Sequence, residues 1–100
     1  MPDWIELSLV ESGGFAGLRR GATVLRAELS VVRARHVDRA LDRLAKKRPR
    51  GAVAYPDAQT LTISVRRAAG SWAACFDTAD LPDAASELLD VAPLRPLPAP

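Results

Sequence analysis

The order of apolar and polar residues along the chain predicts four β-strands, because the two classes alternate in four separate segments. These segments are residues 4–10, 22–29, 60–67 and 72–77. The side chains expected to face the core are Ile5, Leu7 and Leu9; Thr23, Leu25, Ala27 and Leu29; Leu61, Ile63 and Val65; Trp72, Ala74 and Phe76. A glycine-rich loop joins the first two strands and a short turn joins the last two, so we expect two hairpins.

Two helices are predicted as well. Residues 33–47 change to a helical period, with an apolar stripe at Val37, Ala40, Leu41 and Leu44. Pro82 fits the first turn of a second, shorter helix, whose apolar face is Leu81, Ala85, Leu88 and Leu89. The order β-β-α-β-β-α predicts an α+β fold. We expect a four-stranded antiparallel sheet with the main helix packed on one face and a short helix near the C-terminus.

The length of 100 residues fits one domain, to which we assign residues 1–92. Hydrophobic residues make up 48% of the chain, an ordinary share for a protein with a packed core. Residues 93–100 contain four prolines and are expected to form an extended or flexible tail.

The composition offers little for catalysis or metal binding. The chain has one cysteine, Cys75, and one histidine, His36, so we expect neither a Cys/His zinc site nor a His-based catalytic pair. We therefore predict a monomeric binding protein without enzymatic activity, cofactor or metal. A single cysteine fits a reducing compartment, which favours the cytoplasm. No segment approaches the roughly eighteen apolar residues of a membrane helix, so no membrane contact is expected.

The net charge of +2 combines two oppositely charged segments. Residues 19–50 hold eleven Arg and Lys against three acids, whereas residues 74–91 hold five acids and no base. Arg35, Arg39 and Arg43 share one face of the predicted helix, an arrangement that can bind phosphates. A solvated helix face explains the same residues, and the chain has few aromatic side chains to stack on bases. A small nucleic-acid-associated or protein-interaction module is therefore the alternative function.

The segment that points most directly to a function is the loop between the first two strands. Four of the six glycines lie in residues 11–21, and the loop runs Ser12, Gly13, Gly14, Phe15, Ala16, Gly17 and Leu18. Two bulky apolar side chains on a glycine-rich backbone can be presented to a partner. Alternatively, Phe15 packs back onto the sheet and the glycines serve only the turn. A phosphate-binding loop is not predicted, because the G-x-G-x-x-G spacing is absent.

The chain resembles the emfourin family. The resemblance is carried by Ile5-Glu6-Leu7 with the Gly-Gly-Phe-Ala-Gly block, and by Pro56-Asp57-Ala58 before the third strand. Asp80-Leu81-Pro82 with Leu88-Leu89 near the end completes it. The resemblance extends from about Ile5 to Val91. The chain departs from the family pattern at Gln59-Thr60 and in its middle helix, which is more basic than that pattern.

The resemblance implies a function and a site. Emfourin inhibits protealysin, a zinc metalloprotease of the thermolysin family, so a thermolysin-like metalloprotease is the implied partner. Enzymes of this kind cut on the amino side of bulky apolar residues, so their cleft has an apolar pocket beside the zinc ion. We therefore expect residues 12–18 to enter this cleft, with Phe15 as the best anchor because aromatic residues dominate binding energy at interfaces. Glu11 is a candidate accessory contact. The resemblance also implies a bacterial, cytoplasmic protein.

Overall fold

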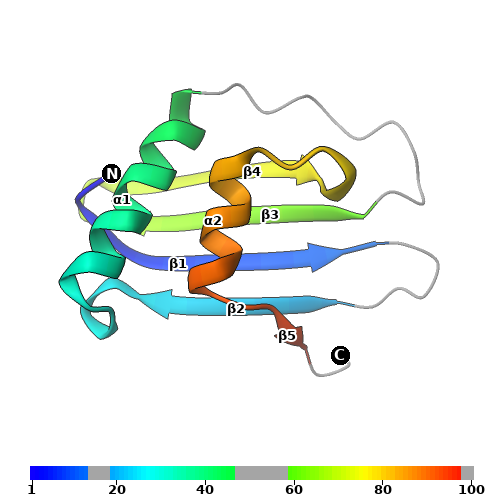
Figure 1. Ribbon diagram of the computed structural model, residues 1–100, viewed down its shortest axis with the longest axis horizontal. Helices are drawn as coiled ribbons and strands as arrows, with labels where there is room; N and C mark the ends of the chain where they lie inside the picture. The colour runs from blue at the N-terminus through cyan, green and yellow to red at the C-terminus, as the bar shows by residue number, and fades with distance from the viewer. Residues whose placement is uncertain (14–18, 47–58, 98–100) are drawn as a thin grey trace.

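The computed structural model describes residues 1–13, 19–46 and 59–97, and it shows the predicted α+β class (Figure 1). The strands are β1 (Trp4–Ser12), β2 (Arg20–Leu25), β3 (Thr60–Arg67), β4 (Gly70–Asp77) and β5 (Arg95–Pro96). The helices are α1 (Val31–Lys46) and α2 (Asp83–Val91), with short 3-10 turns η1 (Arg26–Glu28) and η2 (Thr78–Asp80). The expectation of four strands was wrong, since the sheet has a fifth.

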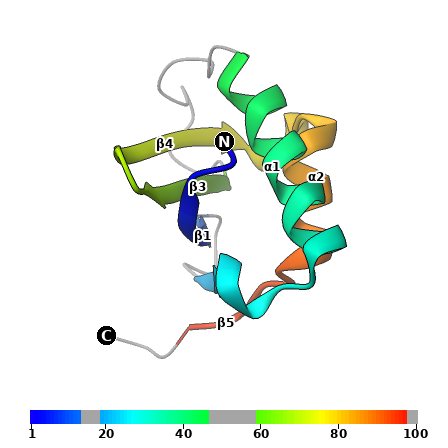
Figure 2. The same cartoon turned by 90° about the vertical axis from the view of Figure 1, so that its left-hand side faces the viewer.

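The five strands form one antiparallel sheet in the order β4-β3-β1-β2-β5. Both helices lie on the same face of this sheet, so the molecule has two layers (Figure 2). The face under the helices is the inner face of the sheet, and the opposite face is the outer face. The predicted hairpins, β1–β2 and β3–β4, are confirmed, and β1 pairs with β3 to join them.

The core fills the space between the sheet and the two helices. On α1 the predicted stripe of Val37, Ala40, Leu41 and Leu44 is fully buried. The inner side chains of β3 are also buried as expected, and Ala74 and Phe76 of β4 lie beside them. On α2 the buried residues are Ala84, Ala85 and Leu88. Leu89 of α2 and Leu81, which precedes the helix, are partly buried and pack against the core. Pro82 precedes α2 as its N-cap residue rather than lying within its first turn.

The start of β1 corrects one expectation. Trp4 lies opposite Arg67 and Glu6 lies opposite Arg66, so the pairing with β3 has a bulge at Ile5. An extra residue in one strand reverses the alternation of side chains on its two sides. Trp4 is therefore buried together with Leu7 and Leu9, whereas Ile5 is exposed on the surface. The prediction that Ile5 faces the core was wrong for this reason.

The orientation of β2 corrects a second expectation. Leu7 lies opposite Val24 and Leu9 lies opposite Ala22, so Val24 and Ala22 face the core. Thr23 was expected on that side but lies on the outer face, where its hydroxyl is 3.5 Å from that of Ser8. The strand also ends at Leu25, where η1 begins, instead of continuing to Leu29. Apolar residues on both sides of this segment, such as Val24 and Leu25, leave its orientation undetermined by pattern alone.

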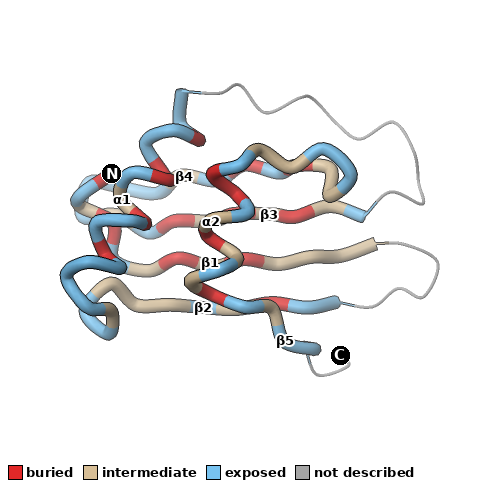
Figure 3. The backbone as a smooth tube through the Cα atoms, in the orientation of Figure 1, coloured by how far each residue is buried: buried red, intermediate tan, exposed pale blue. Residues whose placement is uncertain are grey.

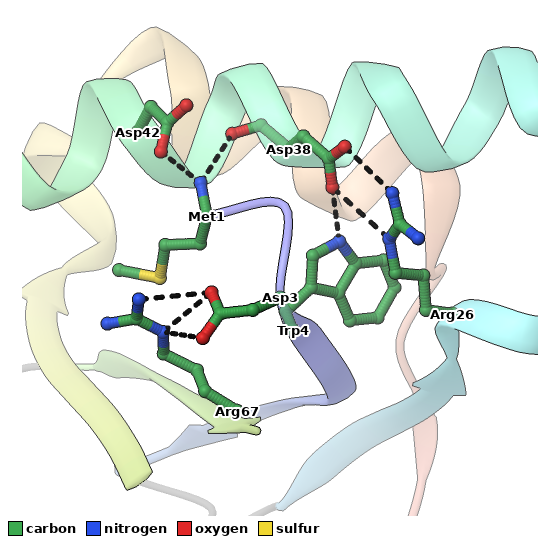
Figure 4. Close-up of polar contacts among 7 residues, drawn as sticks. All are labelled: Met1, Asp3, Trp4, Arg26, Asp38, Asp42 and Arg67. Atoms are coloured by element: carbon green, nitrogen blue, oxygen red, sulfur yellow. Dashed lines mark hydrogen bonds and ion pairs between the residues drawn. The ribbon is translucent and has the colours of Figure 1, made fainter. Parts of the chain in front are cut away.

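A polar cluster ties the start of β1 to α1 (Figure 4). The indole N–H of Trp4 donates to Asp38 Oδ1 at 2.7 Å, and Arg26 Nη2 donates to Asp38 Oδ2 at 3.0 Å. The amino group of Met1 forms an ion pair with Asp42 on the next turn of the helix. Asp38 therefore connects α1 to β1, which is distant in sequence, and to η1, which precedes the helix.

Beside this cluster Arg67, at the end of β3, holds the carboxylate of Asp3 through Nε at 3.0 and 3.2 Å and through Nη2 at 3.0 Å. The hydrogen bonds from Arg67 hold the pKa of Asp3 below its ordinary value of 3.8. A carboxylate with a lowered folded-state pKa stabilises the fold above its unfolded-state pKa, and this stabilisation disappears as the pH falls through the folded-state pKa.

We therefore expect Asp3→Asn to lower the free energy of unfolding at neutral pH but not at strongly acidic pH. Urea unfolding of both proteins across the acidic range measures the difference directly. It should shrink once the pH falls below 3.8 and approach zero when Asp3 is protonated in the folded protein. A difference that stays constant at every pH would contradict the assignment of the Asp3–Arg67 pair as its cause.

Candidate functional site

The end of β1 and the start of β2, which flank the predicted binding loop, lie at the end of the sheet away from α1 (Figure 1). Of the loop residues, the structure describes Ser12 and Gly13; Gly14, Phe15, Ala16, Gly17 and Leu18 lie outside the described residues. The base of the loop is described on both sides, where β1 ends at Ser12 and β2 begins at Arg20. Figure 3 shows buried residues under the helices, with intermediate and exposed residues toward these strand ends. The loop thus starts and ends on the less buried part of the sheet.

Gly13 begins the departure of the chain from β1. Its φ angle is 102°, in the left-handed region that favours glycine. A side chain at this position would strain the backbone, so one of the loop glycines has a definite conformational role. This role is compatible with both interpretations of the loop. The chain must leave the strand direction at Gly13 whether Phe15 packs back onto the sheet or is presented to a partner.

The last residue pair between β1 and β2 is an ion pair. Glu11 lies opposite Arg20, and Glu11 Oε1 accepts hydrogen bonds from Arg20 Nε at 2.9 Å and Nη2 at 2.6 Å. The Glu11 side chain is 15% exposed and Arg20 is 48% exposed. Such a surface pair contributes about 0.2–1 kcal/mol and fixes the separation of the two strands where the loop begins. Glu11 is thus engaged within the protein, and its accessory contact with a protease stays a prediction.

Ser12 points to the other side of the sheet. It follows Glu11, which shares the inner face with Leu9, so Ser12 lies on the outer face opposite Thr60 of β3. The start of β3 is itself fixed, because the backbone N–H of Thr78 donates to the carbonyl of Gln59 at 3.0 Å. The first arm of the loop is therefore supported from outside the hairpin by β3.

The second arm of the loop is supported by β5. Arg20 lies opposite Pro96, Gly21 lies opposite Arg95, and the N–H of Leu97 donates to the carbonyl of Arg19 at 3.0 Å. Sequence reasoning missed this strand, since its prolines pointed to a tail. The one available signal was Leu94, an apolar residue between the prolines, which the structure places against the core. Each arm of the loop is thus held by a strand beyond the hairpin.

The basic face of α1 is less continuous than the sequence suggested. Arg43 Nη1 lies 2.6 Å from Glu87 Oε2, so this arginine links α1 to α2. Arg35 and Arg39 are exposed. The two oppositely charged segments of the sequence meet at this ion pair between the two helices.

Other candidate chemistry is sparse in the described ranges. His36 is exposed on α1, and Cys75 is an exposed free thiol that accepts a weak hydrogen bond from Thr62 at 3.8 Å. Asp77 accepts from the N–H of Ala79 at 2.8 Å, a local capping role. Residues 1–13, 19–46 and 59–97 contain no group of three or more His, Cys, Asp or Glu able to hold a metal ion. Within the same ranges, no helix is long and apolar enough to cross a membrane.

Comparison with known proteins identifies the family. The sequence model of the Emfourin family matches residues 9–93, which span the whole loop, both helices and strands β2, β3 and β4. A search of curated proteins and a search of solved structures each find no match. Emfourin is an inhibitor family, so the match indicates a protease-inhibitor-type role with a protease as partner. The resemblance carried by the Gly-Gly-Phe-Ala-Gly block is thereby confirmed: the chain belongs to the Emfourin family.

Proposed function

We propose that this protein inhibits a thermolysin-like, protealysin-type zinc metalloprotease by placing residues 12–18 in its active-site cleft. The observation that carries the proposal is the Emfourin match over residues 9–93, which includes the complete loop. The inhibitor acts in this proposal as a cytoplasmic monomer without catalytic activity of its own.

The base of the loop supports this proposal physically. Thermolysin-like enzymes cleave on the amino side of bulky apolar residues, so their cleft offers an apolar pocket beside the zinc ion. Phe15 and Leu18 are the bulky apolar residues of the loop. The arms of the loop are fixed by the Glu11–Arg20 pair, by β3 and by β5. A loop whose ends are already ordered loses less conformational entropy when it binds, which favours tight inhibition.

The direct test is titration of a thermolysin-like enzyme with the purified protein, followed with a fluorogenic peptide substrate. We expect dose-dependent inhibition of thermolysin or a protealysin-type enzyme, and none of a serine protease with a differently shaped cleft. Size-exclusion chromatography of the mixture should show a complex with the metalloprotease. Full activity of both metalloproteases at saturating inhibitor would overturn the proposal.

The alternative function rests on the exposed Arg35 and Arg39 of α1. A nucleic-acid module would bind DNA or RNA with strong salt dependence, and reversing these two charges would abolish that binding. An inhibitor would bind no nucleic acid specifically and would keep its inhibition after the same change. One double variant, Arg35→Glu/Arg39→Glu, measured in both assays therefore separates the two functions.

A further inference from the structure

The proposed interface needs more surface than the loop provides. Stable protein–protein interfaces bury about 800 Å² on each partner, with roughly 20–30 residues a side. Residues 12–18 are seven residues, so a tight complex needs additional contacts from the surface beside the loop. The following inference rests on the proposed inhibitory function and concerns which neighbouring surface supplies those contacts.

One surface beside the loop combines unpaired charge with an exposed apolar side chain. It consists of Arg19, Gly21, Arg95 and Leu97, and is called here the β2–β5 corner. Gly21 lies opposite Val10, which places Gly21 on the outer face of the sheet. Arg95 lies directly opposite Gly21 on β5, so its side chain shares the outer face. Arg19 directly precedes β2 and lies beside β5, since its carbonyl accepts a hydrogen bond from the N–H of Leu97.

The side chain of Leu97 packs against Gly21 in this corner. A Cβ atom at position 21 would be 3.1 Å from Leu97 Cδ2 and 3.1 Å from the carbonyl oxygen of Leu9, so only a hydrogen fits there without a shift. Leu97 remains 38% exposed. An open groove lined in part by Val24, Val91 and Pro93 borders the same residues. The corner therefore offers an apolar contact beside a hollow of the surface.

Within the described part of the chain, the charge of the corner is not compensated. Arg19 and Arg95 are exposed, and neither forms an ion pair with any residue that the structure describes. Arg20, the first residue of β2, is neutralised by Glu11. Residues 12–18 and 91–100 contain no Asp or Glu side chain, so the loop and the C-terminal segment add no acidic side chain to this corner.

Among the residues that the structure describes, the other surfaces at the base of the loop lack this combination. On the inner face, Glu11 and Arg20 satisfy each other. Toward β3 and β4, the Asp77 carboxylate accepts a hydrogen bond from the N–H of Ala79, and the Thr78 hydroxyl donates to the carbonyl of Gln59. Arginine is enriched among the residues that dominate binding energy at interfaces, particularly beside desolvated apolar contacts.

We infer that the β2–β5 corner is a second contact surface for the protease held by the loop, and that it binds an acidic patch at the rim of the active-site cleft. Leu97 supplies the apolar contact, and Arg19 and Arg95 pair with carboxylates of the enzyme. Complementary charge at a rim acts mainly on the association rate and is screened by salt. The inhibitor should therefore associate faster at low ionic strength.

The test compares two double charge reversals with thermolysin and a protealysin-type enzyme as the probes. Arg19→Glu/Arg95→Glu alters the corner, and Arg33→Glu/Arg35→Glu alters two exposed arginines of α1, at the other end of the sheet (Figure 1). Both change the net charge equally, so the second controls for the overall charge. At low salt we expect the association rate to fall about 10- to 100-fold for the corner variant and less than about threefold for the control. In 1 M salt the difference should largely disappear.

Structural damage has to be separated from loss of contact, because β5 also supports the loop. Slow hydrogen exchange at the Leu97 amide, which bonds to Arg19, reports whether β5 is still paired in the corner variant. A second variant, Leu97→Ala, keeps both charges and should raise the dissociation rate by about three- to tenfold. The inference would be overturned if wild type, Arg19→Glu/Arg95→Glu and Leu97→Ala had equal association and dissociation rates. It would also be overturned if the association rate fell equally in Arg19→Glu/Arg95→Glu and in the α1 control.

The outcome also separates this inference from the proposed function. If the wild-type protein inhibits and a loop variant does not, the inhibitory function stands whatever the corner variants show. If the wild-type protein inhibits neither enzyme, both proposals fail together. Normal inhibition by the corner variants, with weak inhibition by the loop variant, rejects the corner alone.

Discussion

Replacing Phe15 with alanine is expected to weaken inhibition more than tenfold while leaving the fold intact. Burying a Phe side chain in an apolar pocket contributes about 1.5–3 kcal/mol, and each 1.4 kcal/mol corresponds to about a tenfold change in affinity. Aromatic residues also dominate the few positions that carry most of the binding energy at interfaces. Phe15 is the only aromatic residue of the loop, so its removal should have the largest single effect there.

The same variant decides between the two interpretations of the loop. If Phe15 packed back onto the sheet, its truncation would lower the melting temperature, because large-to-small changes at buried Phe cost about 3–5 kcal/mol. If Phe15 is presented to the protease, stability should change little and inhibition should fall. Thermal unfolding and the inhibition constant, measured on one preparation, distinguish these results.

Two further variants complete the experiment. Val32→Ala truncates an apolar side chain that is 78% exposed on α1, and it should change neither inhibition nor stability appreciably. Leu18→Ala tests the other bulky residue of the loop. Wild-type inhibition by a folded Phe15→Ala variant would reject Phe15 as the anchor and make Leu18 the next candidate.

The sequence predicted best those elements whose pattern is unambiguous. In β3 every second residue from Leu61 to Val65 is apolar and the residues between are polar, so both the bounds and the buried face were correct. The stripe on α1 was correct for the same reason. Strong periodicity on one face leaves a single way to bury the apolar residues.

The errors have local physical causes. Ile5 belongs to a regular alternation, but the bulge beside it depends on pairing with β3, which residues 4–10 alone do not specify. In β2 both faces carry apolar residues, and a shift of one position exchanges the two faces. The prolines of residues 93–100 predicted a tail, but β5 is a strand of two residues. It lies at an edge of the sheet, where proline is tolerated.

The position of the loop between two paired strands could be predicted from the sequence, whereas the strands that support its arms could not. Glycines with two bulky apolar residues between two strands located the loop. The supports of its arms come from Thr60 and from Leu97, which are far away in sequence and do not belong to the hairpin. Nothing near residues 12–18 indicates these partners, because contacts between distant strands depend on the order of strands in the sheet.

The largest expected loss of stability comes from Trp4→Ala. Trp4 is 1% exposed in the core, and truncation of a buried Trp costs about 3–5 kcal/mol. A domain of this size has a total stability of about 5–15 kcal/mol, so the variant should be partly unfolded or should melt far below the wild type. Circular dichroism against temperature or urea measures this directly.

The ring and its hydrogen bond contribute separately to this loss. Trp4→Phe keeps an aromatic ring but removes the N–H that bonds to Asp38. Asp38→Ala leaves that buried donor without its acceptor and also removes the partner of Arg26. An unsatisfied buried donor costs about 1–3 kcal/mol, and each kcal/mol lowers the melting temperature of a domain this size by about 4–8 °C. The exposed Asp90 on α2 gives the matched control, since Asp90→Ala should stay within about 0.5 kcal/mol.

Coupling between the two residues is the decisive quantity. Once the indole N–H is absent, Asp38→Ala no longer leaves a buried donor without an acceptor. The double variant Trp4→Phe/Asp38→Ala should therefore lose less stability than the sum of the losses in the two single variants. Strictly additive losses would mean that the Trp4–Asp38 hydrogen bond contributes nothing. Because Trp4 begins β1 and the predicted loop follows the other end of that strand, the folded fraction of each variant should inhibit like the wild type. Stability and inhibition would then be separable properties, one depending on the attachment of β1 to α1 and the other on the loop between β1 and β2.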